Sequence, residues 1–554
     1  MSAPRIFGAG ILLAILATAS PVAQTGGLPN QGTVGGILNP IGNVISNLTA
    51  PINDEVLPGV TFLLSKFTAT TYTGTATSCD MNAADEYSTT SPEAVGIDTQ
   101  KLKAALSYAA VDGSFSVKVF RNGCEVGQGF RDALMDRVPS LNAGQTKAII
   151  ALIAGIVADR GWVDLDAPID AYVEPGLGDA AHRSRTLRQF MQLTSGAQVN
   201  HVSGLNLFAD ISRTREYFSS TLQYPAGTYY QFDEITPSVV VYCLERAIQN
   251  ATGTNIDFQT FAQLALFDPL GIPTSAYFWQ KDRSGVTTGY SGLWLRPLEY
   301  GRIGLMLLNN GTFGGCRILS EEFVQSMRQG TTANCGFGLY VWLNSCQPGQ
   351  TQVNTDYPSR STLPGEAWIQ SAPNDLYYSL GLGTNTFVIP SLNMVVTRDG
   401  YQELDIVPGA VSGSLNGAFP GNAGGPGDHE FFRLLMASVT NIPPAVRATI
   451  QNSGPYNRPA NEDVSLAPFI LPLSAPLGTY TAVGPHGPVG CNALYCPSSS
   501  NDGLTWLGEV PRVIPGLIGL ESRPSGCDAQ FTGNIDLPDI TIFGEPVFND
   551  TETS

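Results

Sequence analysis

The sequence predicts an α+β fold, and three observations support this prediction. One helical stretch, which opens at residues 144–147 and continues to Gly161, is apolar on almost every side. A helix of this kind lies in the middle of a large fold. Two β-hairpins accompany it: one turns at Asn122-Gly123, and the other occupies residues 386–396.

Length and composition limit what the chain can be. Its 554 residues allow one large domain with extensions, and 43% hydrophobic against 14% charged residues predicts a substantial core. The net charge of −18 argues against nucleic acid or an anionic membrane as a partner. Nine cysteines and four histidines show no zinc-binding spacing, so no metal or other cofactor is expected.

The N-terminus reads as a secretory signal peptide over residues 1–19. Arg5 supplies a positive charge, residues 6–17 are apolar, and Ala17-Thr18-Ala19 is a small-x-small cleavage site. We therefore expect a secreted, extracellular protein without a further membrane span. An uncleaved signal anchor is the alternative, although the apolar run is short for one. Residues 20–85 are rich in Gly, Asn and Thr and predict a linker or stalk.

The folded domain is expected over residues 86–442. It should begin with a helix at 99–110 and a hairpin of strands at 116–120 and 125–130. The long buried helix follows, and later helices end at Thr-Ser-Gly196 and near residues 244–247. The second hairpin and a closing helix at 429–436 complete the domain. Residues 443–554 are rich in Pro and Gly and predict a disulfide-tied cap or a partly disordered tail.

The cysteines fit an oxidising compartment. We expect Cys335 and Cys346 to close a small loop, and Cys491, Cys496 and Cys527 to tie the tail together. Because the number is odd, at least one thiol is free or intermolecular. Glycosylation is expected in a eukaryotic host at four Asn-x-Thr sequons, which begin at Asn47, Asn250, Asn310 and Asn549.

Residues 90–440 resemble the serine β-lactamase and penicillin-binding-protein superfamily, and most closely its esterase and 6-aminohexanoate-dimer hydrolase branch. Lys147, the helix after it, Gly155 and the Leu-Asp-Ala-Pro turn at 165–168 stand at the family's spacing. The resemblance implies a β-lactamase/transpeptidase-like fold. That fold has an antiparallel sheet flanked by helices and a helical subdomain that holds the second catalytic motif.

Three catalytic positions of the family are changed in this sequence. The family's serine stands three residues before the lysine, where this chain has Gly144. The tyrosine of the second motif falls on Phe232, and the cation of the third motif falls near Leu382. Loss of a catalytic nucleophile alone costs about 10⁶-fold in rate in a well-studied protease. The three changes together predict a catalytic site that is degenerate at Gly144, Lys147, Phe232, Glu234 and Leu382.

The resulting hypothesis is a non-catalytic protein that binds a small-molecule or peptide-like ligand, or a partner, through the old cleft. Residues that could line the cleft are Lys147, Tyr230, Asp233, Glu234, Trp294 and Gly383. We expect Asp233 or Glu234 to neutralise Lys147, because an unpaired buried ammonium is costly. The weaker interpretation is that Asp233 and Glu234 act as an acid–base pair in hydrolysis.

An active serine-type hydrolase of amide, ester or peptide bonds, with rearranged residues, is the alternative. Thr146 lies about 100° from Lys147 around the helix and should face elsewhere. Ser140 lies in the preceding loop and could fold in, but nothing in the sequence positions it. A structural extracellular protein whose stalk and tail carry the role is a third possibility.

Overall fold

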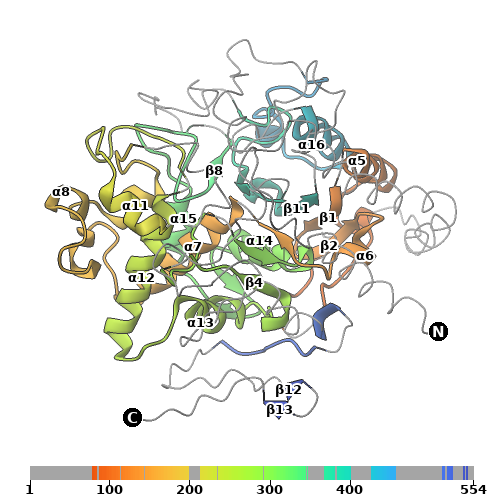
Figure 1. Ribbon diagram of the computed structural model, residues 1–554. Coiled ribbons are helices and arrows are strands. Elements are labelled where there is room, and N and C mark those ends of the chain that lie inside the picture. The colour runs from red at the N-terminus through yellow and green to blue at the C-terminus, as the bar shows by residue number, and fades with distance from the viewer. Residues whose placement is uncertain are drawn as a thin grey trace, which may run out of the picture.

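The computed structural model (Figure 1) describes residues 78–83, 86–112, 114–142, 144–198, 212–233, 235–282, 284–290, 292–344, 346, 367–380, 384–400, 426–456, 515–517, 521–527, 541–542 and 545–546. The predicted signal peptide, most of the predicted linker and the sequons at Asn47 and Asn549 lie outside these residues. The predicted domain bounds stay predictions. Among the described residues, no helix has the length and apolar character needed to cross a membrane.

A six-stranded sheet is the centre of the fold, and every neighbouring pair in it is antiparallel. The strand order is β2-β1-β11-β10-β9-β8, so the first hairpin pairs with the last strand of the chain's second hairpin. The strands are β1 (Ser114–Arg121), β2 (Cys124–Gln128), β8 (Trp342–Leu343), β9 (Tyr377–Leu380), β10 (Thr384–Ile389) and β11 (Met394–Gly400).

Helices cover both faces of this sheet. Successive residues of a strand point to opposite faces, so Thr386 and Phe387 of β10 identify the two layers. Gly304 of α14 (Pro297–Leu308) approaches Thr386, whereas Phe387 packs on Phe432 of α16 (Pro426–Ser438) at 4.9 Å between ring centroids. Helix α5 (Thr99–Val111) packs against α16 and against β1. The predicted α+β class, with an antiparallel sheet flanked by helices, is confirmed.

Local sequence signals explain the first elements. The Asp98 carboxylate accepts hydrogen bonds from the backbone N–H groups of Gln100 and Lys101, which caps the start of α5. Asn122 and Gly123 both have positive φ, at 54° and 78°, as a two-residue turn between β1 and β2 requires. The predicted first helix and first hairpin are therefore confirmed.

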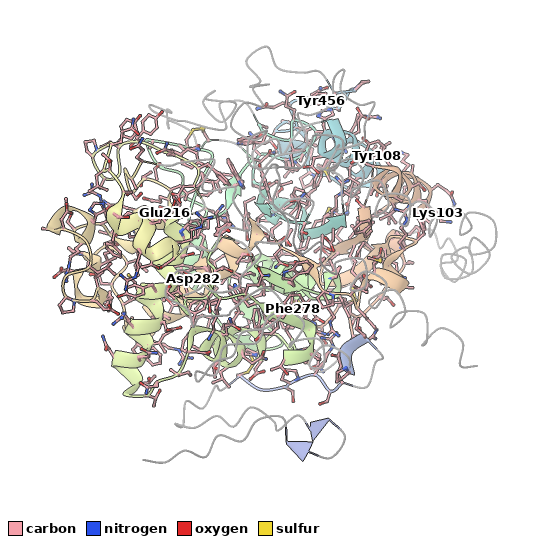
Figure 2. The ribbon with its side chains drawn as sticks, in the orientation of Figure 1. Lys103, Tyr108, Glu216, Phe278, Asp282 and Tyr456 are labelled. Atoms are coloured by element: carbon pink, nitrogen blue, oxygen red, sulfur yellow. A yellow bond between two sulfur atoms is a disulfide. The ribbon has the colours of Figure 1, made fainter. Side chains whose placement is uncertain are left out.

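A mainly helical part lies beside the sheet (Figures 1 and 2). Figure 2 shows Glu216 of α11 in this part and Tyr108 of α5 on the sheet side. A small antiparallel sheet of order β3-β5-β4 joins the two parts. The elements are β3 (Ser140–Leu141), α7 (Gln145–Asp159), α8 (Ala180–Arg183), α9 (Leu187–Met191), α11 (Arg213–Ser219), α12 (Thr236–Thr252), α13 (Phe258–Ala262), β4 (Tyr277–Trp279) and β5 (Leu293–Leu295).

Helix α7 is buried from Gln145 through Val157, as its apolar sequence predicts. Gly155 allows close packing in this helix, because a Cβ atom there would lie 2.5 Å from ring carbons of Phe323. Phe323 belongs to α15 (Glu321–Met327), which packs against the C-terminal half of α7. The shorter remaining elements are α6 (Asp132–Met135), β6 (Thr312–Phe313), β7 (Cys316–Arg317), α17 (Pro444–Arg447), β12 (Thr541–Ile542) and β13 (Glu545–Pro546).

Three disulfides join described cysteines: Cys79–Cys124, Cys316–Cys527 and Cys335–Cys346. The last of these confirms the predicted small loop. The prediction that Cys527 pairs within the tail is wrong, because its sulfur is bonded to Cys316, 211 residues away. The β6–β7 hairpin brings Cys316 beside the tail, and sequence separation alone gave no sign of this. Cys491 and Cys496 lie outside the described residues, and Cys243 is a buried free thiol.

Candidate functional site

The candidate site is built around the N-terminus of α7. Gly144 precedes the first residue of the helix with helical backbone angles, φ −60° and ψ −21°, and provides no side-chain cap. The backbone carbonyl of Gly144 accepts a hydrogen bond from the Lys147 N–H at 3.1 Å. The position that would carry a nucleophile therefore has backbone only, one turn before a buried lysine.

The Lys147 side chain lies over an aromatic ring. Its Nζ is 4.1 Å from the centroid of the Phe232 ring, and both residues are buried, with 3% and 5% of their surface exposed. An ammonium over an aromatic face is attracted by the ring quadrupole. The structure thus brings together the two positions that the sequence singled out, and at Phe232 the group facing the lysine is hydrocarbon instead of a hydroxyl.

Asp233 has a structural role at the next helix. Its Oδ1 accepts hydrogen bonds from the backbone N–H groups of Ile235 at 2.8 Å and Thr236 at 2.7 Å. The Thr236 hydroxyl donates to the same carboxylate. These contacts cap the start of α12, where a carboxylate is also favoured by the helix dipole. Glu234 lies outside the described residues, and the predicted pairing of Lys147 with a carboxylate stays a prediction.

Aromatic side chains fill the space next to Phe232. The Phe232 ring stacks on Trp342 at 6.2 Å between centroids, and Tyr230 contacts both Trp342 and Phe337. Trp342 also packs on Trp368 at 5.0 Å. All five residues are at most 5% exposed. Tyr230, predicted to line a cleft, is therefore part of a packed aromatic cluster.

Two residues near the segment that contains Phe232 have left-handed backbone angles. Leu193 and Tyr340 each have φ of 55°, a conformation that costs about 1–3 kcal/mol for a non-glycine residue. The Leu193 carbonyl accepts a hydrogen bond from the Gln231 N–H, and the Tyr340 N–H donates to the Met191 carbonyl. The surrounding packing thus fixes the segment that contains Phe232 despite local strain.

A buried polar group beside the start of α7 was not predicted. The Ser140 hydroxyl donates to Oδ2 of Asp399 at 2.6 Å, and the Thr384 hydroxyl donates to Oδ1 at 2.9 Å. Burial raises the pKa of Asp399 to about 6. The signal that was missed is Arg398-Asp399, a charged pair at the end of the otherwise apolar strand β11.

The other predicted site residues are distributed over different parts of the fold. Trp294 lies on β5 and stacks on Phe278 at 5.1 Å. Leu382 and Gly383 lie outside the described residues, between β9 and β10. Gln145, which was not predicted, donates from its side-chain nitrogen to the Thr386 hydroxyl at 2.6 Å and so ties α7 to the sheet.

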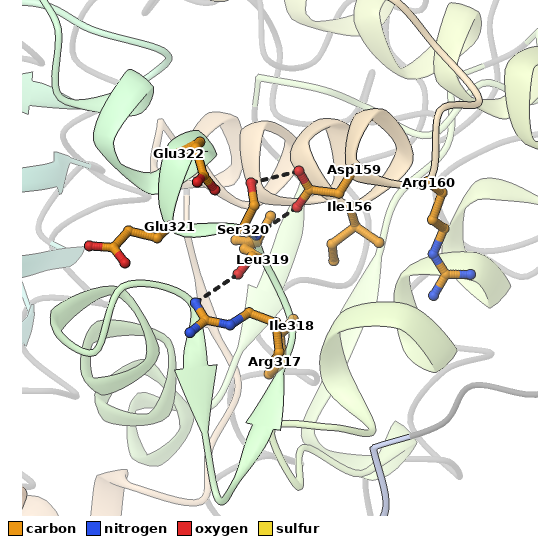
Figure 3. A pocket seen from close by; sticks show the side chains of 9 residues that line it. All are labelled: Ile156, Asp159, Arg160, Arg317, Ile318, Leu319, Ser320, Glu321 and Glu322. Carbon is orange, nitrogen blue, oxygen red and sulfur yellow. Dashed lines mark hydrogen bonds between the residues drawn. The ribbon is translucent and has the colours of Figure 1, made fainter.

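An open pocket is present at the opposite end of α7 (Figure 3). It is lined by Ile156, Asp159, Arg160, Arg317, Ile318, Leu319, Ser320, Glu321 and Glu322. Asp159 accepts hydrogen bonds from the backbone and the hydroxyl of Ser320, both at 2.6 Å, and these contacts fasten α7 to the start of α15. This pocket shares no residue with the Lys147 site, and we assign it a packing role.

Comparison with known proteins agrees with this arrangement. Residues 143–307 match the family model described as Beta-lactamase, and this range includes Gly144, Lys147 and Phe232. A comparison with curated proteins finds no match.

Similar solved structures include a protein assigned as a β-lactamase from Bacteroides dorei DSM 17855, with 18% identity and a TM-score of 0.43 over 62% of this chain and 99% of that one. A 6-aminohexanoate-dimer hydrolase assigned in Bacillus anthracis has 15% identity and a TM-score of 0.42 over 62% and 89%. A penicillin-binding-protein homologue from Caulobacter crescentus has 12% identity and a TM-score of 0.42 over 62% and 99%.

The domain is of the β-lactamase/transpeptidase-like class, with an antiparallel sheet, flanking helices and a buried helix that starts at the site. The match over residues 143–307 supports a β-lactamase-related domain in this chain.

Proposed function

We propose that this protein is a secreted, non-catalytic member of its superfamily that binds a small-molecule or peptide-like ligand, or a partner, with the β-lactamase-related domain. The observation that carries the proposal is that Gly144 stands at the start of α7 while the Lys147 ammonium lies over the ring of Phe232. Acyl transfer in this superfamily needs a serine hydroxyl and groups that move its proton. Gly144 supplies no hydroxyl, and Phe232 can neither take nor give a proton.

The position of Lys147 also opposes its use as a base. A general base must spend time in its neutral form, whereas the face of an aromatic ring stabilises the charged ammonium. The ring cluster of Phe232, Trp342 and Trp368 packs against this site. Three disulfides support the extracellular part of the proposal, because such bonds persist in oxidising compartments.

A second candidate function, a hydrolase with rearranged residues, is favoured by one observation. The Ser140 hydroxyl donates to a buried carboxylate whose pKa is raised to about 6, and Ser140 lies four residues before Gly144. In this case Asp399 would accept the proton of Ser140 as it attacks an acyl carbon. The structural alternative is simpler: two hydroxyls satisfy a carboxylate that burial would otherwise leave without partners.

One experiment separates the two candidates. The wild-type protein is treated with a fluorophosphonate probe across mildly acidic to neutral pH, and labelled sites are mapped by peptide mass spectrometry. The first proposal predicts no covalent label. A label on Ser140 that disappears in S140A would establish the hydrolase. The variant T384V would then test whether the Thr384 hydroxyl, which also donates to Asp399, changes the labelling rate.

A further inference from the structure

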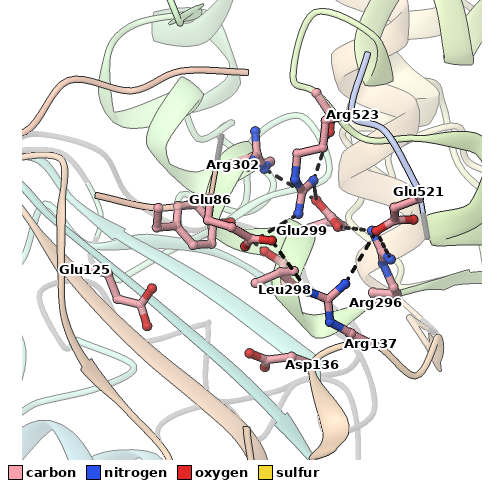
Figure 4. A network of polar contacts seen from close by, with 12 residues as sticks. Glu86, Glu125, Asp136, Arg137, Arg296, Leu298, Glu299, Arg302, Glu521 and Arg523 are labelled. Atoms are coloured by element: carbon pink, nitrogen blue, oxygen red, sulfur yellow. Dashed lines mark hydrogen bonds and ion pairs between the residues drawn. The ribbon is translucent and has the colours of Figure 1, made fainter. Parts of the chain in front are cut away.

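A set of buried charges lies where α14 begins (Figure 4). Nη2 of Arg296 donates to Oε1 of Glu299 at 2.6 Å, and Arg302 Nε lies 3.5 Å from the other carboxylate oxygen. The side chains of Arg296 and Glu299 are fully buried. Buried charges need well-placed partners, because each one left alone costs several kcal/mol. Two of the partners come from the far end of the chain.

The first of these partners is a carboxylate. Residues 521–527, here called the strap, place Glu521 against Arg296, whose Nη1 donates to Oε1 at 2.5 Å. The Ser275 hydroxyl donates to the other carboxylate oxygen, and Arg137 Nη1 lies 3.8 Å from Oε1. Only 9% of the Glu521 side chain is exposed. The domain therefore forms a carboxylate pocket from two guanidinium groups and a hydroxyl.

The second partner is a guanidinium. Nη1 of Arg523 donates to Glu299 Oε2 and to the Gly271 carbonyl, each at 2.9 Å. Its Nη2 lies 3.9 Å from Glu86, which comes from the segment before α5. The Arg523 side chain is 7% exposed. A guanidinium pocket thus stands next to the carboxylate pocket, and Glu299 connects the two.

The charges of the two pockets fit a segment in which a glutamate precedes an arginine by two residues. In an extended segment, residues i and i+2 point to the same face and lie about 7 Å apart. Glu521 and Arg523 have this spacing. A segment with the order Arg-x-Glu would place each charge against a like charge, which costs affinity.

We propose that this face is a peptide-binding site for an extended Glu-x-Arg segment, and that the chain fills it with its own tail. The disulfide between Cys316 and the exposed Cys527 then locks a complex that the two charge pockets already specify. The site shares no residue with the Lys147 site, so it is independent of the function proposed above.

Hydrogen exchange of residues 521–527 in the full-length protein tests the proposal. In C527S we expect the strap amides to exchange more slowly at low salt than in the variants without the ion pairs, because the Glu521 and Arg523 side chains still hold the segment on the domain. In E521Q/R523Q/C527S its amides should exchange at least about tenfold faster. The matched control, E521R/R523E/C527S, keeps the composition and the net charge and should exchange as fast as the neutral triple variant. Exchange in C527S as fast as in both charge variants would show that the disulfide alone holds the strap.

A second set of measurements keeps the disulfide in one arm and uses an added peptide in the other. In E521Q/R523Q with the disulfide intact, the exchange of residues 521–523 should still rise. Binding in trans is measured by adding a synthetic peptide with the sequence of residues 519–526 to full-length E521A/R523A/C527S. The peptide should bind at least about tenfold tighter than one in which Glu and Arg are exchanged. Equal affinity of the two peptides would overturn the recognition site.

Discussion

Two buried lysines in this protein have very different surroundings. Nζ of Lys118, on β1, lies 2.8 Å from Asp136, 3.2 Å from Asp132 and 3.5 Å from Glu125. Nζ of Lys147 lies over the ring of Phe232. Both residues are almost fully buried, at 1% and 3% exposure.

The comparison separates a lysine held by carboxylates from a lysine that lies over an aromatic ring. The carboxylates around Lys118 raise its pKa above the ordinary range, against the effect of burial, and they all lie within 18 residues of it in sequence. The Phe232 ring, by contrast, reaches Lys147 from 85 residues away, at the position predicted to match the tyrosine of the second motif. The carboxylates around Lys118 are close to it in sequence, whereas the ring over Lys147 comes from a distant segment.

The largest expected effect is at Lys118. Lys118→Met would take the cation out of a cluster of three carboxyl groups, and removal of one partner of a buried ion pair costs about 3–5 kcal/mol. We expect a loss of this size in the free energy of unfolding, measured by urea denaturation. K118M/D136N should recover part of it, because the carboxylate nearest to Lys118 is removed. A loss below that of Lys147→Met would contradict the comparison.

The pH dependence of stability should reflect the same cluster. Burial, with the neighbouring Asp136 charge, raises the pKa of Asp132 to about 8 from an ordinary value of about 3.9. The folded protein therefore binds this proton more tightly than the unfolded chain does. Its contribution to stability is complete below about pH 4 and is lost as the pH rises through 8. The free energy of unfolding should therefore fall from about pH 4 to about pH 8 and level off above that.

The neutral variant Asp132→Asn isolates this effect from the repulsion among the protein's many other carboxylates. We expect a flatter pH profile in D132N over the same interval, with the wild-type slope retained in the exposed-site control D166N. Parallel profiles in D132N and wild type would show that Asp132 does not hold the proton.

A smaller effect is expected at Lys147. A cation–π contact is worth about 0.5–1 kcal/mol at an exposed site and about 2 kcal/mol or more when it is desolvated. Lys147→Met, which keeps the length of the side chain, should therefore reduce the free energy of unfolding by about 2 kcal/mol, less than the loss expected for K118M. A double-mutant cycle with Phe232→Leu gives the coupling of the two side chains. A loss as large as that in K118M would show that Lys147 neutralises a buried carboxylate, as the sequence predicted for Asp233 or Glu234.

The smallest expected effect is a gain of reactivity. Gly144→Ser alone should restore little, because no hydroxyl stands at position 232 to move the proton. G144S/F232Y should react slowly with a fluorophosphonate at the hydroxyl introduced at position 144, since acylation needs only a positioned nucleophile and base. Full turnover is not expected. Brisk ester hydrolysis by G144S alone would show that Phe232 does not occupy the position of the lost tyrosine.

The sequence predicted the parts of the fold that have strong local signals. The apolar run of α7, the Asn122-Gly123 turn and the hairpin after residue 384 all carry their structure in a short window. The pairing of Cys316 with Cys527 and the contact of Ser140 with Asp399 could not be read this way. Each joins segments more than 200 residues apart, and their proximity depends on packing of the whole domain.

The sequence also predicted some residues of the candidate site and missed the role of others. Lys147 and Phe232 were found because they stand at fixed distances from recognisable motifs, and the structure places them together. The role of Asp233 as a cap for α12 follows from backbone geometry that the sequence does not display. The third motif remains a prediction at Leu382 and Gly383.

The central claim is that the site around Gly144 and Lys147 no longer catalyses acyl transfer. Its most direct test is hydrolysis of p-nitrophenyl esters and of a β-lactam by the purified wild-type protein, with Lys147→Ala as the matched control. We predict rates equal to the uncatalysed background for both proteins. Saturable turnover by the wild type that disappears in K147A would contradict the claim.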